Sequence, residues 1–169
     1  NFESGVQEKK IISITDGMFG YLLGRKASTK DWIERVSGSR LSMYTRKMMI
    51  EVRGSKADVE RGVLIIDILL KQKACAPKVV EISSLSTRTD TRMIKMHDLE
   101  THRILGVRGQ TLRRLQLEND VFMFFDTLSS TDQRTSTRTL ILISKHKANM
   151  RKALKEVNKL TRRRPAPST

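Results

Sequence analysis

Cysteine, proline and aromatic residues are scarce in this 169-residue sequence, which holds one Cys, three Pro and 5% aromatics. The single thiol, Cys75, excludes an intramolecular disulfide, and with three scattered histidines it forms no metal-ligand spacing. Apolar runs stay shorter than the roughly 18 residues of a membrane span, and no secretory signal is present. We therefore expect no metal, no cofactor, no membrane insertion and an intracellular protein of the cytoplasm or nucleus. The chain begins at Asn1 without a methionine, so we expect it to be a fragment. Because the N-terminus is then missing, location in an organelle is not excluded.

Signatures of catalysis are also missing from the sequence. It contains no paired carboxylates at a site-like spacing and no nucleophile motif. The phosphate-binding pattern G-x-x-x-x-G-K-[ST] and the dinucleotide pattern G-x-G-x-x-G are both absent. The sequence therefore predicts a binding protein and not an enzyme.

Acidic residues are few relative to basic ones. There are 33 Lys and Arg against 18 Asp and Glu, a formal net charge of +15. Residues 1–80 hold 15 basic and 9 acidic side chains, and residues 81–169 hold 18 and 9, so the excess is spread over both halves. Such a balance favours a polyanionic partner, either nucleic acid or an anionic membrane surface, over a merely soluble basic surface.

The chain contains an internal repeat. Each half is predicted to run strand, helix, loop, helix, strand, strand, helix, and the loops begin at Gly24 and Gly106, which are 82 residues apart. The predicted fold class is α+β, with two copies of one unit. We place the first unit at residues 9–74, a linker at 75–91, the second unit at 92–162, and a basic, proline-containing tail at 163–169.

The second loop, Gly106-Val107-Arg108-Gly109, is the strongest candidate site. It follows the apolar pair Ile104-Leu105 and directly precedes an amphipathic helix. The two glycines permit unusual backbone angles and a close approach by a ligand. The helix N-terminus behind the loop presents unpaired N–H groups that favour an anion, and Arg108 adds a mobile positive charge. The loop therefore predicts binding to phosphate groups.

The order of elements, together with the stretch Ile104 to Leu115 (ILGVRGQTLRRL), resembles the eukaryotic-type (type I) K-homology (KH) domain. The resemblance implies units in which a three-stranded antiparallel sheet packs against three helices in the order βααββα. It also implies that the G-x-x-G loop clamps the backbone of about four nucleotides of single-stranded RNA. Whether single-stranded DNA is also bound stays open. The implied role is post-transcriptional regulation or processing of RNA, including mRNA. The implied RNA-binding residues are Ile104, Leu105, Gly106, Val107, Arg108, Gly109, Gln110, Leu112 and Arg113.

The first unit departs from the KH pattern at two positions. Its loop, Gly24-Arg25-Lys26-Ala27, ends in alanine where the family has glycine, and Lys30 stands where an apolar residue is usual. We expect the methyl group of Ala27 to restrict the backbone and obstruct a sugar-phosphate, while Arg25 and Lys26 still attract phosphate. Weaker RNA binding by Gly24, Arg25, Lys26 and Ala27 and a mainly structural role both remain open.

A protein-interaction or dimerisation module with the same fold is the alternative function. The helix expected at residues 55–73 is apolar nearly all round, which predicts that it is covered on more than one side. Phe122 and Phe124 alternate with Met123 and Phe125, so each pair faces one side of the sheet. We expect the outer pair, Phe122 and Phe124, to be covered rather than to stack on bases.

Overall fold

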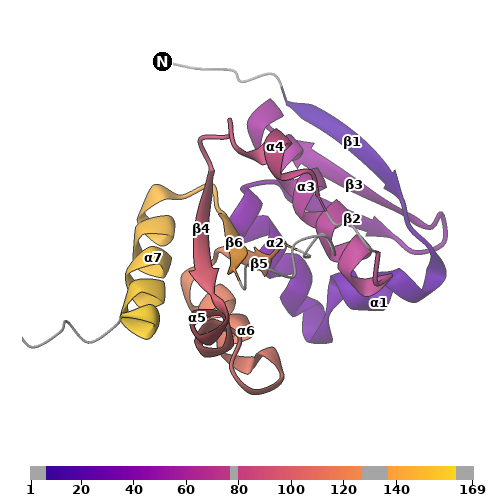
Figure 1. The fold of residues 1–169 in the computed structure, drawn as a ribbon. Helices are drawn as coiled ribbons and strands as arrows, with labels where there is room; N and C mark the ends of the chain where they lie inside the picture. The colour runs from indigo at the N-terminus through magenta and orange to yellow at the C-terminus, as the bar shows by residue number, and fades with distance from the viewer. Residues whose placement is uncertain (1–6, 77–79, 127–136, 163–169) are drawn as a thin grey trace, which may run out of the picture. The chain divides into compact units, whose positions relative to one another are not determined.

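The computed structural model describes residues 7–76, 80–126 and 137–162, so the predicted tail at 163–169 lies outside the described residues. The chain divides into two compact units, 1–81 and 82–169, each with its own sheet and helices (Figure 1). The boundary falls within the predicted linker. The finer limits, 9–74 and 92–162, stay a prediction.

Unit 1 has its sheet strands in the order β1-β3-β2, all antiparallel. Strand β3 lies in the middle, where Ile50 and Val52 are fully buried and Arg53 is exposed on the other face. This alternation follows from the two-residue period of a strand, and it directs the apolar side chains towards the helices. The elements are β1 (Glu8–Ser13), α1 (Asp16–Leu23), a 3₁₀ turn (Arg25–Ala27), α2 (Ser28–Ser37), β2 (Arg40–Tyr44), β3 (Met49–Gly54) and α3 (Lys56–Lys73).

Unit 2 repeats this topology with the strand order β4-β6-β5, again antiparallel. Its core joins both sheet and helices through Met96, Leu115, Leu140, Met150 and Val157. The elements are α4 (Ile82–Leu85), β4 (Thr91–His97), α5 (Asp98–Leu105), a 3₁₀ turn (Val107–Gly109), α6 (Gln110–Asn119), β5 (Phe122–Phe125), β6 (Thr137–Ile143) and α7 (Lys147–Thr161). The predicted α+β class with two KH-like βααββα units is therefore confirmed.

The repeat extends to individual hydrogen bonds between the second helix of each unit and the strand that follows it. In unit 1 the backbone N–H of Leu41 donates to Glu34 Oε2 at 3.0 Å. In unit 2 the N–H of Met123 donates to Gln116 Oε1 at 3.2 Å. Both partners in unit 2 lie 82 residues after their counterparts, the same interval that separates Gly24 from Gly106. The two units therefore position their loops on equivalent frameworks.

Helix α3 is buried on more than one side, as its sequence predicts. Ile65, Ile66 and Ile68 are all fully buried although they point in different directions around the helix axis. The helix also carries a buried ion pair, in which Arg61 Nη1 lies 2.9 Å from Asp58 Oδ1 and donates to the carbonyl of Ser37 at 2.7 Å. That network attaches α3 to the end of α2.

Among the residues that the structure describes, no helix is both long enough and apolar enough to cross a bilayer.

Candidate nucleic-acid interface

The G-x-x-G loop of unit 2 separates helix α5 from helix α6. Helix α5 ends at Leu105, and its last turn is closed by the N–H of Gly106, which donates to the carbonyl of His102 at 2.9 Å. Three loop residues then have positive φ: Gly106 (φ 70°), Arg108 (φ 55°) and Gly109 (φ 73°). Helix α6 begins immediately afterwards at Gln110. The tight turn therefore lies directly at the N-terminus of helix α6.

The two glycines of this loop have different physical roles. A Cβ on Gly106 would lie 2.7 Å from Thr111 Cβ and 3.0 Å from Thr111 N, so a side chain there is excluded by packing. A Cβ on Gly109 would meet no atom within 4 Å among the described residues. Gly109 therefore adopts its left-handed conformation without strain, and it leaves open space at the outer side of the turn where a ligand can approach.

The predicted site residues around the loop differ in exposure. Val107 is 76% exposed, and Arg108, Gln110 and Arg113 are also exposed. Leu105 and Leu112 are half-buried, so each keeps part of its apolar surface accessible. Ile104 is fully buried in the core of unit 2, so it supports the surface from below and has no area of its own for contact with a base. The helix period separates it from its neighbour Leu105 by about 100°.

Arg113 and Arg114 also differ, although they are adjacent. Arg114 Nη1 lies 3.1 Å from Glu118 Oε2, so a carboxylate stands beside its charge. Arg113 has no carboxylate partner among the residues that the structure describes. Both arginines line a shallow hollow of about 390 Å³ on α6, together with Gln110 and the 53% exposed Leu117. Arg113 is therefore the cation of this pair that is available to an outside anion.

The N-terminus of α6 is electrostatically open. Gly109 occupies the N-cap position without a side-chain cap, and the first turn of α6 contains no acidic residue. Helix α2 of unit 1 is also uncapped by a side chain, but it carries Asp31 in its first turn. A carboxylate at that place neutralises part of the helix dipole, so α6 is the better of the two helices at attracting an anion.

The loop of unit 1 follows the same backbone path despite its alanine. Gly24 (φ 73°, ψ 175°), Lys26 (φ 52°, ψ 38°) and Ala27 (φ 61°, ψ 20°) match Gly106, Arg108 and Gly109 closely. A Cβ on Gly24 would lie 2.7 Å from the backbone nitrogen of Thr29. Ala27 therefore has the same left-handed conformation as its counterpart Gly109, and the alanine does not change the path of the loop. The difference between the two loops at this position is the methyl group of Ala27, which occupies the space that Gly109 leaves open.

The surface beside the unit 1 loop is charged where that of unit 2 is apolar. Lys30 occupies the position of Leu112, and its Nζ lies 3.1 Å from Glu34 Oε1. The side chains of Lys30 and Glu34 are 24% and 18% exposed, so the pair is partly buried. An ion pair at this place offers a base less apolar contact than a leucine does.

The phenylalanines of β5 do not form an open aromatic surface. Phe122 and Phe124 are 1% and 2% exposed, and their ring centroids are 5.2 Å apart. The expectation that this pair is covered is therefore confirmed. On the other face, Met123 belongs to the core and Phe125 packs against it.

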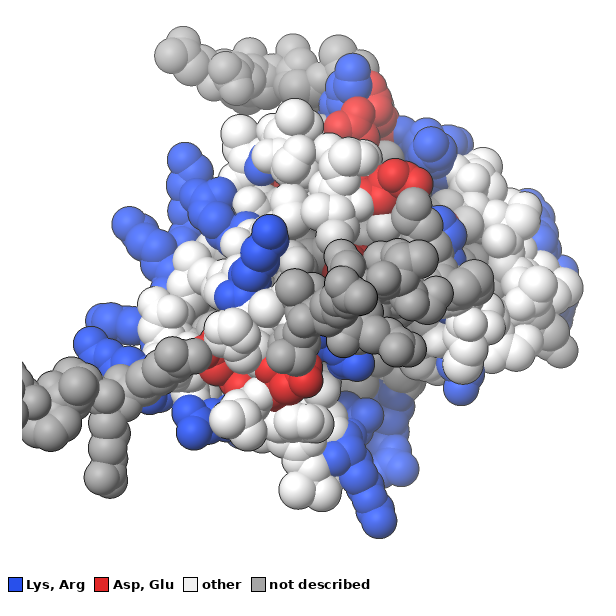
Figure 2. Space-filling view, viewed as in Figure 1, with Lys and Arg blue, Asp and Glu red and all other residues white. Residues whose placement is uncertain are grey.

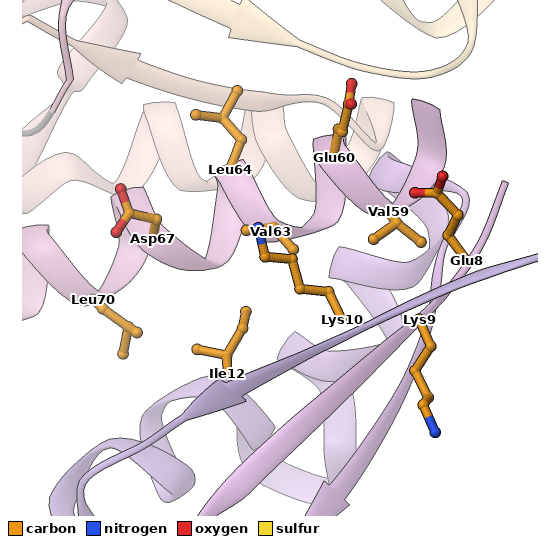
Figure 3. A pocket seen from close by; sticks show the side chains of 10 residues that line it. All are labelled: Glu8, Lys9, Lys10, Ile12, Val59, Glu60, Val63, Leu64, Asp67 and Leu70. Carbon is orange, nitrogen blue, oxygen red and sulfur yellow. The ribbon is translucent and has the colours of Figure 1, made fainter. Parts of the chain in front are cut away.

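Unit 1 contains a groove of about 480 Å³ between strand β1 and helix α3 (Figure 3). Ile12 from β1 and Val63 and Leu70 from α3 point into this space, and the stem of Lys10 crosses it. Glu8 and Asp67 also line it, so its charges are mixed. An apolar floor with mixed charges suits a protein segment better than a phosphate backbone.

The fold defines an α+β protein of two KH-like units. Comparisons with known proteins find solved structures that are similar at low sequence identity. No family model matches the sequence, and no curated relative matches it either. The crystal structure of Dim2p from Pyrococcus horikoshii is 15% identical, with 92% of this chain and 91% of that chain covered and a TM-score of 0.35.

Two further crystal structures give similar values. One is the complex of a/eIF2alpha, aDim2p and rRNA from the same organism, at 16% identity, 96% and 90% coverage and a TM-score of 0.36. The other is a protein of unknown function from Aeropyrum pernix, at 12% identity, 92% and 83% coverage and a TM-score of 0.37. Likeness at these values carries no function to this chain.

Proposed function

We propose that this chain binds single-stranded RNA through unit 2 and serves post-transcriptional regulation or processing of RNA. The observation that supports it most is the interruption between α5 and α6. There an uncapped helix N-terminus, an exposed Arg108 and a glycine with open space at its outer side occur together. Such a turn is suited to hold a phosphate backbone at close range. Single-stranded DNA presents the same phosphates and is included in the proposal.

In this proposal the backbone and the bases of the RNA contact different parts of unit 2. The amide groups of Val107 and Arg108 meet phosphates, and Arg108 and Arg113 add charge. The amide groups of Gly109 and Gln110 already donate to carbonyls within the turn, those of Gly106 and Val107. Leu105 and Leu112 provide apolar area against which bases lie, with Ile104 holding that area from within the core. A site of this kind reads about four nucleotides and binds weakly by itself.

Unit 1 acts in this proposal as a weaker binder or as a structural partner. Its loop keeps the backbone geometry and two exposed cations, Arg25 and Lys26. The methyl group of Ala27 and the Lys30–Glu34 pair replace the open glycine and the apolar floor of unit 2. If both units engage one RNA, the linked sites bind more tightly than either alone, because the second contact is intramolecular.

A fluorescence anisotropy titration tests the proposal. A labelled, unstructured RNA of about six nucleotides is compared with a duplex of the same sequence, because a clamp that reads unpaired bases requires a single strand. We expect the single strand to bind at least about tenfold more tightly, with a log–log salt slope near −0.7 per phosphate neutralised. Equal binding to both, or no binding to the single strand, would contradict the proposal.

Dimerisation through α3 is the second candidate, and the groove beside β1 is the observation that favours it. In that case the groove residues Ile12, Val63 and Leu70 would be covered by a second copy. Size-exclusion chromatography with light scattering, with and without the short RNA, separates the two functions. A dimer whose molar mass does not change when RNA is added supports dimerisation, whereas a monomer that binds RNA supports the first proposal.

A further inference from the structure

Helix α7 carries a continuous stripe of positive charge along its outer side. Lys147, Arg151, Lys152, Lys155, Lys159 and Arg162 are all exposed. At 100° per residue these six positions fall within an arc of about 140° around the helix axis. The buried residues Met150, Ala153 and Val157 lie on the opposite side, against the core. Lys and Arg side chains gather over α7 at the left of Figure 2.

In the part of the chain that the structure describes, no carboxylate neutralises this stripe. None of its six cations forms an ion pair within residues 7–76, 80–126 and 137–162. The one acidic residue of α7, Glu156, is half-buried and lies 3.5 Å from Asn119 Nδ2, on the side of the helix that faces α6. The stripe is therefore a surface of one sign, about four turns long.

The corresponding helix of unit 1 shows that the fold does not require such a stripe. Aligning the N-cap residues Ser55 and His146 places Leu64 at the position of Lys155 and Ile68 at that of Lys159. Two of the four cations of α3 are instead paired with neighbouring carboxylates. Arg61 pairs with Asp58 and Lys71 pairs with Asp67, each at 2.9 Å.

The stripe also lowers the stability of its own helix. Lys147, Arg151, Lys155 and Lys159 follow one another at intervals of four residues, and like charges at that spacing repel. A row of phosphates laid along the helix would relieve this repulsion and release counterions from the nucleic acid. The stripe offers no aromatic side chain on which a base could stack, so it suits the backbone and not the bases.

We propose that the outer face of α7 binds the phosphate backbone of the RNA segments that flank the nucleotides held by the Gly106–Gly109 loop. This inference rests on the proposed function of unit 2 and extends it. Unit 2 then has a footprint longer than the four or so nucleotides of the loop site. Its affinity therefore rises with RNA length even though the additional contacts read no sequence.

The test compares the variant Lys147→Gln/Arg151→Gln/Lys155→Gln with the wild-type chain on two RNAs, of about six and about twenty nucleotides. We expect the variant to bind the long RNA at least about tenfold more weakly, with a salt slope shallower by about 2, and the short RNA within about twofold of wild type. The control Lys9→Gln/Lys10→Gln/Lys56→Gln removes the same charge from exposed positions of unit 1 and should lose less than about threefold on the long RNA. Circular dichroism verifies that both variants are folded.

Three results separate the possible roles of α7 and of the loop. If the α7 variant binds the long RNA like wild type, or if the control loses as much, α7 is not a nucleic-acid surface. If the α7 variant loses affinity for phosphatidylserine vesicles and not for RNA, the stripe serves a membrane and the inference is overturned. Failure of the loop proposal has a separate signature, because the wild-type chain would then not bind the short RNA at all.

Discussion

Ala27 and Gly109 occupy the same position in their units and have nearly the same left-handed backbone conformation, with φ of 61° and 73°. An alanine in that conformation places its Cβ close to its own backbone, at a cost of about 1–2 kcal/mol, which glycine does not incur. Unit 1 therefore keeps its loop geometry because the surrounding frame holds it, and not because Ala27 favours it.

Ala27→Gly is expected to stabilise unit 1. Relief of the left-handed strain exceeds the additional entropy that glycine gives to the unfolded chain, so the net gain in unfolding free energy is about 0.5 kcal/mol. The chain has one tryptophan, Trp32, which is 5% exposed in unit 1, so urea denaturation followed by its fluorescence reports this unit. A decrease in stability would show that the methyl group makes favourable contacts.

The two glycines of the second loop are expected to respond differently to alanine. Gly106→Ala should lower the unfolding free energy of unit 2 by more than about 2 kcal/mol, because the added Cβ meets Thr111 and φ is 70°. Gly109→Ala should cost only about 1 kcal/mol, because its Cβ enters open space. Amide hydrogen exchange in α6 measures both effects. Equal losses would contradict the distinct roles assigned to the two positions.

A gain-of-function pair tests the difference between the units. Ala27→Gly/Lys30→Leu gives unit 1 the loop glycine and the apolar floor residue of unit 2. In a chain whose second loop has been inactivated, we expect this pair to raise affinity for the short RNA at least about tenfold, since each contact adds roughly 1 kcal/mol. Anisotropy measures it, with Lys30→Leu alone as the control. No gain would mean that another feature of unit 1 prevents binding.

The buried pair of α3 is expected to contribute far more stability than an exposed one. Arg61→Ala leaves Asp58 charged and buried and removes a donor from the Ser37 carbonyl, which should cost about 3–5 kcal/mol. Lys71→Ala breaks an exposed pair of the same 2.9 Å length with Asp67 and should cost less than about 0.5 kcal/mol. Trp32 fluorescence in urea reports both variants. Similar losses would show that burial is not what distinguishes the two pairs.

Much of the fold could be predicted from the sequence because the repeat is spaced regularly and its glycines mark the breaks. The 82-residue interval locates both loops, and the apolar periods locate the helices and strands around them. The roles of single site residues do not follow from the repeat. Ile104 and Leu105 are adjacent aliphatic residues, and only the phase of α5 shows that the first is core and the second is partly open.

Other features depend on side-chain reach, which a linear pattern does not give. Glu34 and Gln116 each bind a backbone N–H seven residues away, across a turn. The stripe on α7 was present in the sequence as cations four residues apart. Only the structure shows that this face of α7 has no carboxylate. The one acidic residue of the helix, Glu156, contacts α6 instead.

Anisotropy with the variant Val107→Asp/Arg108→Asp tests most directly whether the second loop holds the RNA backbone. Val107 is 76% exposed, and aspartate tolerates the left-handed conformation of Arg108, so the fold should be intact. We expect two carboxylates at this turn to abolish binding of the short RNA, and the matched variant Arg25→Asp/Lys26→Asp to weaken it less. Binding by Val107→Asp/Arg108→Asp within about twofold of wild type would contradict the account, because phosphates cannot then be held at the loop.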